Sequence, residues 1–151
     1  MVAKLKDSTS AAPAASRQGP LVWRKTFPGT LDQPAQVRRE LVTALQTRPD
    51  LDEILLVASE LCTNAVIHTR SGHQGGTFMI EVTADGESLL IAVTDSGAPT
   101  EPRLLNPAQT DTNFRGLYVV KALSDGYGVH GDAEGRTVWA LFASSGRVAD
   151  A

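Results

Sequence analysis

The segment from Leu51 to Thr69 places the strongest constraint on the fold, because its apolar residues recur with the period of an amphipathic helix. Pro49 and Asp50 precede the segment, and we expect Asp50 to cap the N-terminus of the helix. The apolar positions are Leu51, Ile54, Leu55, Ala58, Leu61, Cys62, Ala65 and Val66.

Two polar residues, Glu60 and Asn64, interrupt this apolar pattern four positions apart. That spacing places both side chains on one face of the helix, and His68 extends the same stripe. A carboxylate can accept a proton or orient an attacking group, and an amide oxygen is a neutral ligand for Mg²⁺. Taken alone, a polar pair at this spacing is more often a solvated face, so its meaning depends on the other motifs.

The composition is that of an ordinary globular chain: 151 residues, of which 42% are hydrophobic and 21% charged. The net charge of −3, without a dense basic patch, argues against direct binding of nucleic acid. No apolar run is long enough to span a membrane or to follow Lys4 and Lys6 as a signal peptide, so we expect a cytoplasmic protein with no membrane partner. Cys62 is the only cysteine, and its neighbours favour a buried apolar role.

The chain divides into three parts. Residues 1–20 are rich in Ala, Ser, Thr and Pro, which predicts a disordered arm. We expect residues 21–143 to form a single domain and residues 144–151 to form a loose tail. The patterns in the domain predict, in order, a strand at 21–27, a helix within 31–48, the helix at 51–69, a flexible loop at 71–76, and strands at 77–83 and 88–94 joined by a turn at 84–87. A long loop at 95–113, a helix at 116–123 and strands at 126–130 and 136–142 follow.

Strands paired as hairpins, with helices segregated to one side, predict an α/β (α+β) two-layer sandwich. We expect a mixed, mostly antiparallel sheet with three helices on one face. The elements do not alternate as in a doubly wound nucleotide fold, and the chain has no phosphate loop of the G-x-x-x-x-G-K-[ST] type.

Four motifs, in this order, resemble those of the GHKL superfamily of ATP-binding domains, which has the histidine-kinase-like ATPase fold. Glu60–His68 resembles the N box, Asp95–Gly97 the first glycine box, Arg115–Leu117 the core of the second, and Gly135–Trp139 the closing strand motif. The resemblance covers about residues 21–143. More narrowly, the chain resembles the small stand-alone anti-sigma factor serine/threonine kinases and their regulatory relatives.

The resemblance implies ATP and Mg²⁺ as cofactors. Asn64 would be the metal ligand, and Glu60 would be the catalytic residue that acts as general base or orients the nucleophile. Asp95 would accept a hydrogen bond from the adenine amino group, and Gly97 would let the backbone approach the base. Thr137 would support the adenine end. Judged from the residues alone, Asp95 is more readily a turn residue and Thr137 ordinary strand filler.

The resemblance also implies a lid over about residues 98–114, closing above the phosphates. Arg115, Gly116 and Leu117, at the start of the next helix, would bind the nucleotide there. From the sequence alone, Arg115 is equally a surface residue near a helix start, where the helix dipole gives it no help.

The implied function is an ATP-dependent serine/threonine kinase that phosphorylates an antagonist protein, sequesters a sigma factor, or does both. Small relatives of this kind often act as homodimers. The alternative is a catalytically weak or inactive module that regulates a partner by docking. Phe114 in place of the usual glycine of the second box, and Pro99 and Pro102 in the lid, favour this alternative.

Overall fold

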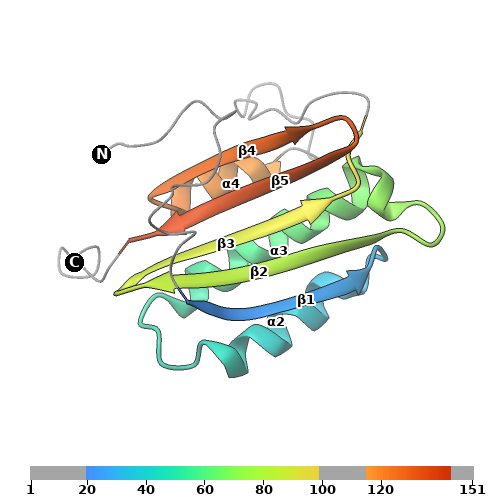
Figure 1. Ribbon diagram of the computed structural model, residues 1–151. Coiled ribbons are helices and arrows are strands. Elements are labelled where there is room, and N and C mark those ends of the chain that lie inside the picture. Colours follow the sequence, from blue (N-terminus) through green and yellow to red (C-terminus); the bar gives the residue numbers. More distant parts are fainter. Residues whose placement is uncertain (1–19, 99–114, 144–151) are drawn as a thin grey trace.

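A five-stranded sheet covered on one face by helices makes up residues 20–98 and 115–143, the part of the chain that the computed structural model describes (Figure 1). The strands are β1 (Leu21–Pro28), β2 (Thr77–Asp85), β3 (Ser88–Asp95), β4 (Gly126–Asp132) and β5 (Gly135–Phe142). The helices are α2 (Gln33–Ala44), α3 (Leu51–His68) and α4 (Arg115–Leu123), with a 3₁₀ turn η1 (Arg70–Gly72). The arm predicted at 1–20, the lid at 98–114 and the tail at 144–151 lie outside the described residues, apart from Pro20 and Ala98.

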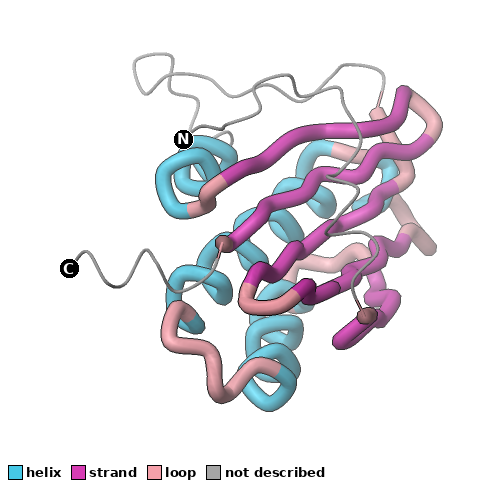
Figure 2. The backbone as a smooth tube through the Cα atoms, turned by 60° about the vertical axis from the view of Figure 1, so that its left-hand side comes forward, coloured by secondary structure: helices cyan, strands magenta, loops and turns pink. Residues whose placement is uncertain are grey.

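The strands lie in the order β1-β2-β3-β5-β4, and each neighbouring pair is antiparallel. Figure 2 shows the helices gathered along one side of this sheet. The predicted two-layer sandwich is therefore confirmed, with a sheet that is antiparallel throughout the described residues rather than mixed. Asp85 pairs with Ser88, so the turn between β2 and β3 is tighter than predicted, and Gly86 takes the positive φ of 65° that it requires.

The core lies between the helices and the sheet, because alternate residues of the inner strands are apolar. Cys62 lies fully buried in this core, as predicted, and burial raises the pKa of its thiol. No helix of the described residues is long and apolar enough to cross a membrane. The core residues of the strands include Phe78, Ile80, Val82, Leu89, Ile91, Val93, Ala140 and Phe142, and those of α3 include Ile54, Val57, Ala58, Leu61 and Ala65.

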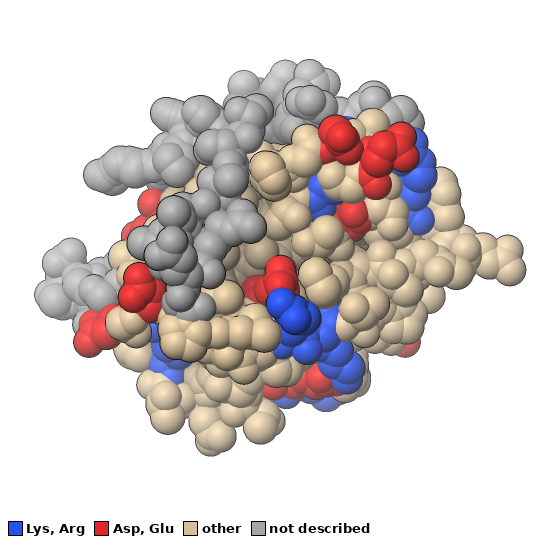
Figure 3. All heavy atoms as spheres, viewed as in Figure 1, with Lys and Arg blue, Asp and Glu red and all other residues tan. Residues whose placement is uncertain are grey.

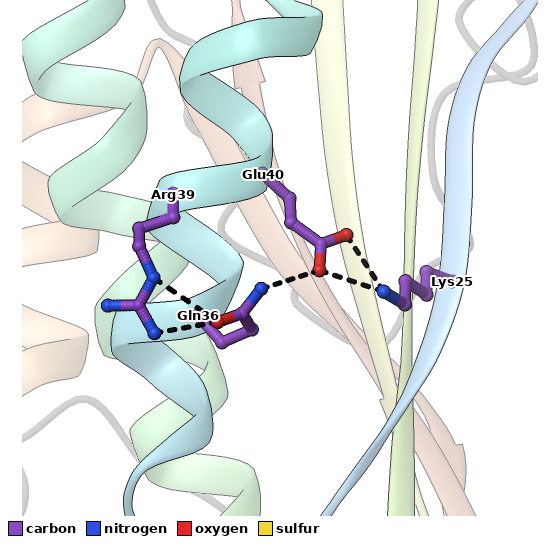
Figure 4. A network of polar contacts seen from close by, with 4 residues as sticks. All are labelled: Lys25, Gln36, Arg39 and Glu40. Carbon is purple, nitrogen blue, oxygen red and sulfur yellow. Dashed lines mark hydrogen bonds and ion pairs between the residues drawn. The ribbon is translucent and has the colours of Figure 1, made fainter.

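A polar network fastens α2 to the edge strand β1 (Figure 4). Nζ of Lys25 donates to the two carboxylate oxygens of Glu40, at 3.0 and 2.8 Å. Gln36 donates to Glu40 at 2.8 Å and accepts from Arg39 at 2.6 Å. The hydrogen bond from Lys25, followed by that from Gln36, lowers the pKa of Glu40.

The connection from α2 to α3 differs from the sequence prediction at two points. α2 ends at Ala44, short of the predicted limit at 48, and the chain reaches α3 through turns. Asp50 directly precedes α3, but its side chain makes no capping hydrogen bond. Both of its carboxylate oxygens instead accept from the guanidinium of Arg48, at 3.0 Å each, and this bidentate pair occupies the oxygens that a cap would use.

Charged side chains are interspersed on the side of the molecule seen in Figure 3, where basic groups lie next to acidic ones. Arg24 of β1 and Glu81 of β2 form an ion pair, in which their side chains approach to 2.9 Å. These strands pair Arg24 directly with Glu81, so both side chains project from the same face of the sheet.

Candidate functional site

Glu60 and Asn64 lie on successive turns of α3, at the border of its buried side. Both residues are half-buried, whereas Leu61 and Ala65, which directly follow them, belong to the core. The apolar pattern of the segment therefore fixes the rotation of the helix and leaves the polar stripe beside the core rather than in open solvent.

The amide nitrogen of Asn64 is not engaged by any described residue. Its Nδ2 atom is buried and has no hydrogen-bond partner. Leaving a buried donor unsatisfied costs about 1–3 kcal/mol, so such groups are rare without a reason. The amide N–H groups could thus donate to a partner beyond the described residues, such as a phosphate oxygen, whereas a metal would bind the amide oxygen.

The carboxylate of Glu60 is likewise uncommitted, since it makes no hydrogen bond or ion pair with any described residue. Burial alone raises its pKa. A carboxylate with a raised pKa holds a proton more readily, which suits a general base that works near neutral pH.

β3 ends at Asp95, where the carboxylate closes a turn. Its Oδ1 atom accepts from the backbone N–H of Gly97 at 2.6 Å. Burial raises the pKa of Asp95, and this effect is opposed by the N–H of Gly97 and by the charge and backbone N–H of Arg136. Asp95 therefore does act as a turn residue. Because a carboxylate has about four acceptor positions, Asp95 can still accept a hydrogen bond from another donor.

Gly97 is a glycine for two structural reasons. Its φ is +82°, and a Cβ atom there would lie 2.1 Å from the carbonyl oxygen of Ala133 in the turn between β4 and β5. The loop after β3 therefore packs against this turn through bare backbone, a contact that only glycine permits.

The C-terminal end of α3 is tied to the same loop, and Figure 1 shows the ends of α3 and β3 side by side. The backbone N–H of Arg70 donates to the carbonyl of Gly97 at 2.8 Å, and its Nη1 donates to that of Ala133 at 2.6 Å. The backbone N–H of Ser96 donates to Oγ of Ser71 at 2.9 Å. Ser71 is fully buried, so the segment predicted as a flexible loop at 71–76 begins with a packed turn.

Thr137 lies away from Asp95. In the register of β3 and β5, Asp95 pairs with Arg136 and Thr94 pairs with Thr137. Successive side chains of a strand project from opposite faces, so Thr137 and Asp95 are on different sides of the sheet. The hydroxyl of Thr137 lies 2.8 Å from that of Thr94. Its role at the adenine stays a prediction, without support from this placement.

The second glycine-box residues lie at the start of α4, which begins at Arg115 and packs against α3. The helical backbone at Arg115, Gly116 and Leu117 places the N-terminus of α4 in the helix layer that contains Glu60 and Asn64. The side chains at these three positions are outside the described part of the structure, so their phosphate contacts stay predictions.

Sequence reasoning missed two arginines. Arg70 lies two residues after the N box and joins it to the first glycine box. Arg136 is buried, with 5% of its surface exposed, and its Nη2 donates to the carbonyl of Ala98 at 2.9 Å. One signal could have revealed Arg136: it shares the alternation of Val138 and Ala140, whose positions the pattern assigns to the core.

Three comparisons with known proteins bear on this arrangement. Residues 27–142 match the family described as the histidine kinase-like ATPase domain. Among curated proteins, none matches this chain. The fold is similar to the crystal structure of the RsbU and RsbW domains of Rv1364c from Mycobacterium tuberculosis, with a TM-score of 0.56 and 21% identity over 80% of this chain. The match covers 31% of that longer chain.

The fold is also similar to a chain in the crystal structure of the SiaB-SiaC complex from Pseudomonas aeruginosa. The TM-score is 0.56 and the identity 9%, over 85% of this chain and 93% of that one. At these identities the two structures support the fold alone, whereas the family match spans nearly the whole described region. The chain therefore belongs to the histidine kinase-like ATPase domain family.

Proposed function

We propose that this chain is an ATP-binding regulatory protein that acts as an anti-sigma factor serine/threonine kinase. The observation that carries the proposal is the pair on α3. Among the described residues, the buried amide nitrogen of Asn64 has no partner, and neither has the half-buried carboxylate of Glu60 one turn away. Within a family of ATPase domains, such uncommitted polar groups beside the core fit a ligand-binding role.

The residues fit Mg²⁺ and ATP in chemical type. The amide oxygen of Asn64 would be a neutral ligand, and Mg²⁺ characteristically takes few protein ligands beside phosphates and water. Asp95 retains acceptor capacity for the adenine amino group, and Gly97 would let the backbone approach the base. Arg115, Gly116 and Leu117 would hold the phosphates, where the free N–H groups of a helix start favour an anion.

In the kinase reaction, ATP supplies the γ-phosphoryl group and Mg²⁺ neutralises charge on the phosphate oxygens. Glu60 would take the proton that a serine or threonine hydroxyl loses as its oxygen bonds to the γ-phosphorus, while the bond from that phosphorus to the bridging oxygen breaks and ADP leaves. The carboxylate is suited to this task because burial raises its pKa. Asn64, on the same helix face, would orient the charged groups without adding a negative charge of its own.

The protein partner would be an antagonist that is phosphorylated, a sigma factor that is sequestered, or both, and the chain would act as a homodimer. Support for a protein partner comes from one of the similar folds, which occurs in a structure of a two-protein complex. The other similar structure combines RsbU and RsbW domains in one chain.

Calorimetric titration tests the nucleotide site. Wild-type protein should bind ATP more tightly with Mg²⁺ than without it, and more tightly than GTP. Asn64→Ala should weaken binding of Mg-ATP far more than binding of metal-free ATP, because it removes the proposed metal ligand. Thr63→Ala, on the neighbouring position of α3, is the matched control and should preserve both affinities. Equal losses with and without Mg²⁺ would exclude Asn64 as a metal ligand.

A docking module with a lapsed nucleotide site is the second candidate function. The observation that favours it is the turn at the end of β3, where Asp95 binds the N–H of Gly97 and thus has a structural task without any nucleotide. If ATP, with or without Mg²⁺, does not bind at millimolar concentration, this second function replaces the first.

A further inference from the structure

The loop that leaves β3 is held at three consecutive carbonyl groups. That of Ser96 accepts from Nη1 of Arg70 at 3.3 Å, and that of Gly97 accepts from the backbone N–H of Arg70 at 2.8 Å. The carbonyl of Ala98 accepts from Nη2 of Arg136 at 2.9 Å. Two arginines from distant parts of the sequence thus fix the backbone of this turn.

Arg136 also stands directly opposite Asp95 in the register of β5 and β3. Paired residues share a face of the sheet, with their Cβ atoms about 5 Å apart. Val138 and Ala140 continue this face into the core below the helices. A guanidinium that is 95% buried needs hydrogen-bond acceptors and a counter-charge, because an isolated buried cation is costly, and a carboxylate suits its geometry.

Arg136 is one of the groups that favour the ionised form of Asp95. Burial raises the pKa of Asp95, whereas the N–H of Gly97, the charge of Arg136 and the N–H of Arg136 lower it, in that order of size. Arg136 is therefore the charged group that opposes the effect of burial. The ionisable side chains on the surrounding elements include Glu60 and His68 of α3 and Arg70 of η1, His130 and Asp132 of β4, and Glu134 in the β4–β5 turn.

We propose that Arg136 is a positioning residue for base recognition, which keeps Asp95 as a fixed carboxylate so that it accepts from a purine amino group and rejects a purine carbonyl. This inference rests on the proposed function, in which Asp95 meets the adenine. A carboxylate only accepts hydrogen bonds, whereas a protonated carboxyl also donates one. A neutral Asp95 would therefore discriminate poorly between adenine and hypoxanthine, which has a carbonyl where adenine has its amino group.

The test compares the dissociation constants of ATP and of ITP, which carries hypoxanthine, over a range of pH. Calorimetry on R136Q should show the ITP-to-ATP ratio reduced about tenfold at the pH where Asp95 holds a proton, and restored as rising pH ionises Asp95 again. The midpoint of this restoration should lie at higher pH than that of the wild type. R136K retains the charge and should keep most of the discrimination. In D95N the ratio should not change with pH.

Two outcomes would overturn the proposal. One is an equal weakening of ATP and ITP by R136Q at every pH, because a structural loss does not follow the ionisation of Asp95. The other is a loss of discrimination in R136K that is as large as that of D95N near neutral pH. R136K also supplies the test if R136Q does not fold. Failure of wild-type protein to bind ATP at all is distinguishable from both, and would overturn the proposed function and this inference with it.

Discussion

The hydroxyl groups of Thr94 and Thr137 lie 2.8 Å apart across β3 and β5, on the face of the sheet opposite to Asp95. This relationship gives Thr137 a structural partner that needs no nucleotide. The strand motif that resembles the family's closing strand thus places two neighbouring residues, Arg136 and Thr137, on different sides of the sheet, and only the former is on the side of Asp95.

Thr137→Val should lower stability and leave nucleotide affinity nearly unchanged. The substitution removes one partner of a half-buried hydrogen bond, which costs about 0.5–1.5 kcal/mol. Denaturant unfolding and ATP titration of the same variant check the two halves of the prediction. Thr94→Val is the matched control, and the double variant should lose less than the sum of the single ones. A large, selective loss of ATP affinity in Thr137→Val would instead restore the role at the adenine.

Glu60→Gln should raise the melting temperature relative to wild type, increasingly so as pH rises. Burial raises the pKa of Glu60 in the folded protein, so the folded state holds this proton more tightly than the unfolded state does. This contribution to the stability of the wild type is present below the ordinary glutamate pKa. It is lost as pH rises through the raised pKa of Glu60 in the folded protein. Melting curves of both proteins between the ordinary and the raised pKa check this pH dependence. A difference in melting temperature that stays constant with pH would contradict it.

The same variant should lose phosphoryl transfer while it retains ATP. A general base contributes about 10²–10⁴-fold to a rate, and glutamine cannot accept the proton. Phosphorylation of the antagonist by wild type and Glu60→Gln measures the first effect, and calorimetry with Mg-ATP measures the second. Transfer that survives in the variant would assign the proton to another group.

The spacing of apolar residues predicted much of this fold, because the buried face of a helix or strand can be identified within a short stretch of sequence. The rotation of α3 could be predicted in this way, and with it the half-buried placement of Glu60 and Asn64. The position of Thr137 relative to Asp95 could not, because it depends on the register between two strands that are distant in sequence. The same non-local pairing decides whether Arg136 faces Asp95.

Side-chain competition explains a second kind of difference. Asp50 has the residue type and the position of a helix cap, yet its carboxylate binds Arg48, two residues before it. The preference for Asp at a helix cap considers only the hydrogen bonds between its carboxylate and the free N–H groups of the helix. It does not consider a nearby guanidinium, which offers the carboxylate two charge-assisted hydrogen bonds. Such competition is settled only by the path of the backbone between α2 and α3.

Glu40→Gln should destabilise the protein only slightly, by about 0.2–1 kcal/mol at low salt. Its partner Lys25 is partly exposed, with 48% of its side chain accessible, so solvent and salt screen the pair. Hydrogen bonds from Lys25 and Gln36 lower the pKa of Glu40, so its contribution is present at neutral pH and is lost as pH falls through that lowered value. Urea unfolding of wild type and variant at low and high salt checks this, and a difference insensitive to salt would contradict it.

Gly97→Ala should destabilise the protein much more than Gly86→Ala, although both glycines have positive φ, of 82° and 65°. At Gly86 nothing lies within 4 Å of the place that a methyl group would take, so the cost is that of the backbone conformation alone, about 1–2 kcal/mol. At Gly97 the methyl group would lie 2.1 Å from the carbonyl oxygen of Ala133, and the loop has to move away from the β4–β5 turn. That movement would also break the contacts of Arg70 with Ser96 and Ala133, so ATP affinity should fall together with stability. Denaturant unfolding and ATP titration of both variants measure this, and similar losses of stability in the two would show that the loop shifts freely.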